Sequence, residues 1–190
     1  MTVTAAHAEI DMRFDPESSR VSWTRRAGSD APAAAVEICR PKPIITYAAP
    51  CMPSQVIVDT GPLVAFFDAD DDHHASCVST LKGLTQSLVT LWPAVTEALH
   101  LLAFSSIAQQ GLLSWLAESG AQLAPLSPSD IPRIQELLRR YKDLPMDFTD
   151  AALIAVAERD NIKTVFTVDK RDFHIYRPRH VRMFHLLPPP

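Results

Sequence analysis

Short runs of β-branched and aliphatic residues alternate with longer segments of helical period along most of the chain. The clearest run is Val56-Ile57-Val58, which ends at Asp59 and is followed by Gly61-Pro62. Three consecutive β-branched apolar residues favour a short, fully buried strand. Proline is tolerated in the first turn of a helix, so the pattern predicts that a helix follows this strand directly.

The same alternation continues to the end of the chain and predicts an open α/β fold with a mainly parallel sheet. The predicted strands cover residues 55–59, 88–91, 121–126, 163–167 and 181–187. The predicted helices cover residues 63–67, 73–84, 94–104, 107–118, 129–141 and 149–159.

The first 54 residues differ from the rest. They show no sustained period and are rich in Ala, Ser, Pro and charged residues, with one candidate short strand at 36–45. This composition is typical of a poorly ordered segment. We therefore divide the chain into an N-terminal extension, residues 1–54, and a folded domain, residues 55–190.

Composition narrows the class of protein. Apolar residues make up 47% of the chain, enough for an ordinary core, yet no apolar run approaches the roughly 20 residues needed to cross a membrane. The three cysteines, Cys39, Cys51 and Cys77, are scattered, which argues against a disulfide framework and for a reducing compartment. There is no signal-peptide layout at the N-terminus. We expect a cytoplasmic protein without a membrane segment.

The distribution of charge is more informative than its sum. The net charge is −4, and because residues 1–51 carry six basic and six acidic side chains, all of the excess lies in residues 52–190. Basic residues gather in one late segment: Lys170, Arg171, Arg177, Arg179 and Arg182. An acidic centre beside a basic margin suits a metal-dependent enzyme acting on a polyanion. A solvated charged tail is the simpler alternative.

Four acids occupy equivalent places in the predicted fold. Asp59 and Asp169 end predicted strands, Asp150 begins a helix with Asp147 three residues before it, and Glu97 lies one turn into another helix. Each has a simpler explanation as a helix cap or a solvent-facing residue. In a parallel sheet, however, all four places open onto the same edge, where the carboxylates would repel one another. Divalent cations with oxygen ligands, Mg²⁺ or Mn²⁺, would relieve that repulsion.

Other polar motifs have weaker functional interpretations. The acidic run at 68–72 is better explained by a favourable interaction with the dipole of the following helix than by a calcium-binding loop. The Gly and the closing Glu of such a loop are missing. Adjacent His73 and His74 would point to different faces of a helix, which disfavours a zinc site. His100 is expected to be a hydrogen-bonded histidine in the core or at its rim. For Arg133, Arg139, Arg140 and Lys142 we expect a solvated face, with phosphate contact as the alternative.

Four sequence fragments in order resemble the PIN domain, and specifically the VapC-like ribonuclease toxins. They are VIVDTGPL at 56–63, WPAVTE at 92–97, MDFTDAALIA at 146–155 and VFTVDKRDF at 165–173. The resemblance covers about residues 55–187. It implies a three-layer α/β/α sandwich with a central, mainly parallel sheet.

The resemblance also implies an activity. The family's members are Mg²⁺- or Mn²⁺-dependent endoribonucleases, commonly homodimers inhibited by a small antitoxin protein. Carried over to this chain, Asp59, Glu97, Asp150 and Asp169 become the catalytic, metal-binding acids, and Asp147 becomes an additional acid. The expected reaction is hydrolysis of an RNA phosphodiester that leaves 5′-phosphate and 3′-hydroxyl ends.

Three other interpretations concern the same residues. A haloacid dehalogenase-type phosphatase needs a second Asp two residues after the first, where this chain has Gly61. A receiver domain needs an earlier acidic pair and a later strand-end Lys, and neither is found. A PIN-like module that binds RNA or protein without catalysis stays open, although all four acids are present.

Overall fold

The computed structural model describes residues 10–15, 20–25 and 54–189. The chain divides into two compact units, residues 1–42 and residues 43–190. In the first unit, β1 (Ile10–Asp15) and β2 (Arg20–Arg25) pair in an antiparallel hairpin. We did not predict this hairpin. The candidate strand at 36–45 lies outside the described residues, and the domain boundary at residues 54/55 stays a prediction.

The second unit is built on a five-stranded sheet in which every neighbouring pair is parallel, in the order β5-β4-β3-β6-β7. The strands are β3 (Gln55–Val58), β4 (Ser87–Thr90), β5 (Gln122–Leu123), β6 (Thr164–Phe166) and β7 (His185–Leu187). Because β3 is central, its three β-branched residues are fully buried. The predicted parallel sheet is therefore confirmed.

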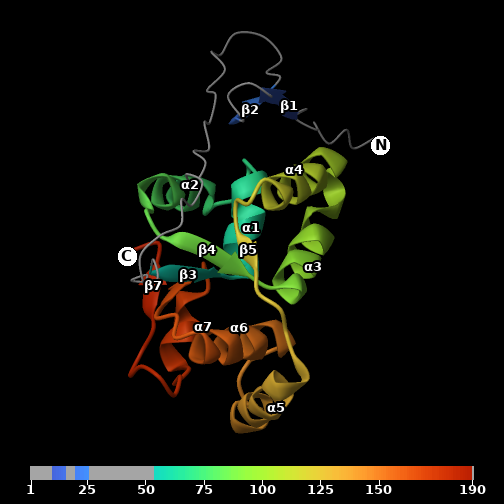
Figure 1. Cartoon of the computed structure of the whole chain (residues 1–190). Coiled ribbons are helices and arrows are strands. Elements are labelled where there is room, and N and C mark those ends of the chain that lie inside the picture. Colours follow the sequence, from blue (N-terminus) through green and yellow to red (C-terminus); the bar gives the residue numbers. More distant parts are fainter. Residues whose placement is uncertain (1–9, 16–19, 26–53, 190) are drawn as a thin grey trace, which may run out of the picture. The chain divides into compact units, whose positions relative to one another are not determined.

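Helices cover both faces of this sheet (Figure 1). On one side lie α1 (Thr60–Phe67), α2 (His74–Gly83), α3 (Trp92–Leu101) and α4 (Ser106–Ala117), with the short 3₁₀ helix η1 (Leu102–Phe104) between α3 and α4. On the other side lie α5 (Ile131–Arg140), α6 (Phe148–Arg159) and α7 (Lys170–Ile175), with η2 (Pro128–Asp130) leading into α5. The result is a three-layer α/β/α sandwich.

Helix α6 is the most deeply buried helix of its layer. Every residue from Ala151 to Ala157 is buried, and the small side chains among them let the helix approach the sheet closely. Ile57 of β3 and Val165 of β6 belong to the same apolar cluster as α6. This packing fixes the N-terminus of α6 relative to the ends of the central strands.

The predicted elements correspond to the observed ones, with one helix not predicted and differences at several ends: α1 begins at Thr60 and α3 ends at Leu101. Helix α7 was not predicted, β7 is shorter than the expected 181–187, and β5 is shorter than the expected 121–126. In the described part of the chain, no helix has the length and apolar character required to cross a membrane.

Gly61 marks a close approach between α1 and the segment after β6. A Cβ added at Gly61 would lie 2.3 Å from Val168 Cγ2, whereas one added at Gly83 meets nothing within 4 Å. Valine is stiff at χ1, so Val168 cannot move aside freely. We expect G61A to lower the free energy of unfolding by ~1–3 kcal/mol. G83A, the control, should change it by less than ~1 kcal/mol. Equal denaturant midpoints for the two variants would contradict this close packing.

Candidate functional site

Asp59 lies where β3 ends and α1 begins, and both of its carboxylate oxygens are held. The backbone N–H of Thr60 donates to Oδ1 at 2.7 Å, and the hydroxyl of Thr167 donates to Oδ2 at 2.7 Å. Asp59 is only 9% exposed. Its carboxylate is therefore fixed between the ends of two neighbouring strands, β3 and β6.

Glu97 is connected to Asp59 through Thr60, the residue that follows Asp59 in the sequence. The Thr60 hydroxyl donates a hydrogen bond to Glu97 Oε2 at 2.8 Å. Thr60 is the first residue of α1 and Glu97 lies in α3, two helices that pack against each other. Thr60 thus connects Asp59, through its N–H, with Glu97, through its hydroxyl.

Asp150 and Asp147 form a capping box at the start of α6. The Asp150 N–H donates to Asp147 Oδ1 at 2.9 Å, and the Asp147 N–H donates to Asp150 Oδ2 at 3.4 Å. The hydroxyl of fully buried Tyr176 also donates to Asp150 Oδ2, at 3.3 Å. Asp147 is exposed, whereas Asp150 is partly buried and oriented by a side chain from beyond α7.

Asp169 caps α7 and is exposed. Its carboxylate accepts a hydrogen bond from the Asp172 N–H at 3.3 Å. Its own N–H donates to the Thr167 hydroxyl at 3.0 Å. Because that hydroxyl also donates to Asp59, Thr167 connects the first and the fourth of the predicted acids.

Burial and mutual repulsion disturb the ionisation of two of these acids. Burial, more than any other cause, raises the pKa of Asp59 to about 6, and the nearby Asp147 and Glu97 raise it further against the hydrogen bonds from Thr167 and Thr60. Burial likewise raises the pKa of Asp150 to about 7, followed by the charges of Asp59 and Asp147. The structure thus brings Asp59, Glu97, Asp147 and Asp150 within electrostatic reach of one another.

The donor set has the chemistry of a site for a hard divalent cation. All of the groups are carboxylates, the ligands that hard cations prefer. No lysine or arginine is among the groups that alter the pKa of Asp59 or Asp150, so these groups do not balance the negative charge. As they stand, however, no three His, Cys, Asp or Glu side chains in the described ranges form a group that could hold a metal ion. The acids fit such an ion in donor type and charge, and they are connected in pairs through Thr60, Thr167 and the capping box.

Comparison with known proteins identifies the family. The sequence model of the PIN domain matches residues 56–177. This chain belongs to the PIN domain family. It is 29% identical over 135 residues to Ribonuclease VapC26 of Mycobacterium tuberculosis, a match that covers 70% of this chain and all of that relative.

Solved structures agree with this fold. VapC20 of Mycobacterium tuberculosis, a sarcin-ricin loop cleaving toxin, superposes with a TM-score of 0.60 at 20% identity, covering 67% of this chain and 98% of that one. VapBC2 of Rickettsia felis, solved with a DNA fragment from its promoter, gives a TM-score of 0.51 at 17% identity, covering 70% and 96%. At these identities the likeness shows the PIN fold, and the predicted family resemblance is confirmed.

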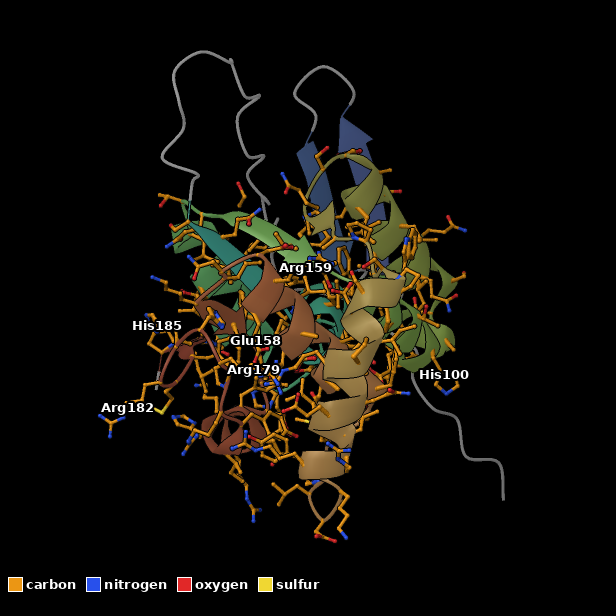
Figure 2. The ribbon with its side chains drawn as sticks, turned by 60° about the horizontal axis from the view of Figure 1, so that its bottom comes forward. His100, Glu158, Arg159, Arg179, Arg182 and His185 are labelled. Atoms are coloured by element: carbon orange, nitrogen blue, oxygen red, sulfur yellow. The ribbon has the colours of Figure 1, made fainter. Side chains whose placement is uncertain are left out.

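His74 and His100 are not among the groups that alter the pKa of Asp59 or Asp150 in this PIN domain. His74 Nδ1 lies 2.7 Å from the carbonyl oxygen of Ala65, so it has a local structural contact. His100 is exposed, as its outward position in Figure 2 shows, which excludes the core, one of the two positions expected for it, the core or its rim.

Several arginines of the two basic segments have structural partners. Arg133 has a side chain only 10% exposed and pairs with Glu158, so the expected solvated position was wrong. Arg177 donates to three carbonyl groups at the end of α7. Arg179 pairs with Glu136. These contacts leave fewer basic side chains to face a polyanion than the sequence suggested.

Sequence reasoning missed two residues that orient the acids, Thr167 and Tyr176. Thr167 directly follows β6, two residues before Asp169, and a hydroxyl beside a candidate acid just after a strand was a usable signal. Tyr176 lies 26 residues from Asp150 in sequence. No local pattern indicates that contact, since it depends on how α7 packs against α6.

The raised pKa of Asp59 predicts how the free energy of unfolding changes with pH. Below its ordinary pKa of 3.8 the carboxyl is protonated in both the folded and unfolded states, so burial carries no charge penalty. Between pH 3.8 and about 6 the unfolded carboxyl ionises while the folded one keeps its proton, so the metal-free protein loses stability through that range, and the full loss is present above about 6. We expect D59N to raise the free energy of unfolding by ~1–3 kcal/mol well above pH 6, with no gain below pH 3.8.

The measurement is denaturant unfolding in the presence of a chelator across that pH range. D143N, which changes an exposed acid in the loop after α5, is the matched control and should leave the profile unchanged. A D59N profile parallel to that of the wild type would show that Asp59 ionises without penalty.

Proposed function

We propose that this protein is a Mg²⁺- or Mn²⁺-dependent endoribonuclease and the toxin of a type II toxin–antitoxin pair. The observation that carries the proposal is the crowding of acids at one edge of a PIN-fold sheet, where burial and like charge raise the pKa of Asp59 and Asp150. The relation to Ribonuclease VapC26 supports RNA as the substrate.

Asp59, Glu97, Asp150 and Asp169 would hold the cation, with Asp147 as an additional donor. When bound, the cation would neutralise charge on the scissile phosphate and promote attack by water, which gives 5′-phosphate and 3′-hydroxyl ends. The side chains around the acids keep them in place for that role. Thr167 and the Thr60 N–H fix Asp59, the Thr60 hydroxyl fixes Glu97, and Tyr176 restrains Asp150.

A second candidate is a PIN module that binds RNA or protein without catalysis. One observation favours it, namely that no three acids in the described part of the chain are placed to hold an ion as they stand. Against it, a module that only binds gains nothing from burying Asp59 beside other acids, an arrangement that destabilises the folded protein. We therefore prefer the enzyme, in which a cation compensates that repulsion.

Exposed apolar side chains on α3, η1 and α4 leave room for a protein partner. Trp92, Leu101 and Phe104 are 57%, 54% and 61% exposed, and Ile107 at the start of α4 is 39% exposed. An antitoxin and a second copy of the chain are the two partners we propose, in a cytoplasmic setting.

Substitution of the acids tests the activity. D59N and D150N should each reduce Mg²⁺- or Mn²⁺-dependent cleavage of RNA to background, because each removes one negative ligand while keeping the shape of the side chain. A chelator should abolish cleavage by the wild type, and D143N should cleave as the wild type does. The assay is the release of 5′-phosphate ends from a labelled RNA. Unchanged cleavage by D59N and D150N would assign the activity to another site or to a contaminant.

A further inference from the structure

A buried tyrosine hydroxyl reaches Asp150 from the C-terminal end of α7. Tyr176 directly follows this helix, its side chain is fully buried, and its hydroxyl donates to Asp150 Oδ2 at 3.3 Å. The Tyr176 ring packs against the rings of Tyr141 and Phe173, with centroid distances of 5.2 and 5.5 Å. Packing therefore fixes the ring, and the hydroxyl is a donor held in place beside the acid.

The backbone at Tyr176 has restraints that do not involve Asp150. The hydroxyl of Tyr141 accepts a hydrogen bond from the Arg177 N–H at 2.9 Å. The Arg177 guanidinium in turn donates to three carbonyl groups at the end of α7, including that of Tyr176. Because the ring and the backbone are both held without the bond to Asp150, removal of the hydroxyl should leave the rest of Tyr176 in place.

Asp150 depends on this hydroxyl more than Asp59 depends on any single donor. Asp59 has one donor on each carboxylate oxygen, both at 2.7 Å. The two donors to the Asp150 carboxylate are the Tyr176 hydroxyl and, at 3.4 Å, the Asp147 N–H, and both end on Oδ2. Among the residues that the structure describes, none donates to Asp150 Oδ1. Tyr176 is thus the nearer of two donors that hold one oxygen of Asp150, while the other oxygen is left open.

We propose that Tyr176 is a positioning residue of the candidate metal site: its hydroxyl holds Oδ2 of Asp150 so that Oδ1 stays available to the cation. The inference rests on the proposed function, which makes Asp150 a ligand of that cation. Removal of a hydrogen bond that orients a metal ligand typically weakens metal binding by roughly 10- to 100-fold. A hydroxyl that only stabilises the fold has no such effect on metal affinity, so the two roles can be separated by experiment.

Two neighbouring tyrosines provide the variant and its matched control. Y176F removes only the hydroxyl and keeps the ring that packs against Tyr141 and Phe173. Y141F removes a hydroxyl from a tyrosine that is also buried, but that hydroxyl bonds to the Arg177 N–H and not to an acid. Each variant loses one hydrogen bond, so we expect both to lower the denaturant midpoint to a similar extent.

Mn²⁺ binding to the full chain is measured by calorimetry without RNA, starting from metal-free protein. We expect Y176F to weaken Mn²⁺ binding about tenfold, at the lower end of the range for such donors, and Y141F to bind Mn²⁺ as the wild type does. Cleavage of RNA at limiting Mn²⁺ should decrease in Y176F, and saturating Mn²⁺ should restore it. General structural damage would instead lower cleavage at every Mn²⁺ concentration.

The outcomes distinguish this inference from the nuclease assignment. Equal Mn²⁺ affinity of Y176F and the wild type overturns the role of Tyr176 and leaves the proposed function standing, as does an equal loss of affinity in Y141F and Y176F. Weaker Mn²⁺ binding by Y176F alone, in a protein that cleaves no RNA, supports the role of Tyr176 and contradicts the nuclease. A wild-type protein that binds no Mn²⁺ overturns both.

Discussion

Crowded carboxylates at the carboxyl edge of the parallel sheet are the constraint on which the rest of the site depends. The central strand β3 delivers Asp59 into a nearly dry position, and the fold restrains it with donors from Thr60 and Thr167. Those hydrogen bonds favour the charged form, yet burial and the neighbouring acids outweigh them, because the pKa of Asp59 still rises to about 6. The fold thus stores an unfavourable charge arrangement that a divalent cation would relieve.

Much of this arrangement could be predicted because it follows from chain order. Asp59 directly follows a buried β-branched strand, and in a parallel sheet the neighbouring strand β6 must end on the same edge, where Thr167 bonds to Asp59 and to the Asp169 N–H. The parts that could not be predicted depend on packing between distant segments. The Thr167–Asp59 bond spans 108 residues, and Arg133 was expected in solvent because its partner Glu158 belongs to another helix. Helix α7, at six residues, was too short to show a helical period.

Helix α6 carries charged side chains at both of its ends. Its small buried residues hold it against the sheet, so that Asp150 at one end faces the other acids while Glu158 at the far end organises Arg133 and Arg179. The two ends differ in charge balance. The acids at the first end have no basic partner among the groups that alter the pKa of Asp59 or Asp150, whereas at the far end Arg133 is paired with Glu158 and Arg179 with Glu136.

Proton release on metal binding tests the central claim most directly. Mn²⁺ is titrated calorimetrically into the metal-free protein at a pH between the raised pKa values of about 6 and about 7, in buffers of different ionisation enthalpy. If the cation binds where Asp59 and Asp150 are crowded, it must displace their protons, so we expect net proton release that decreases in D59N. Binding without proton release, or release unchanged in D59N, would contradict the account.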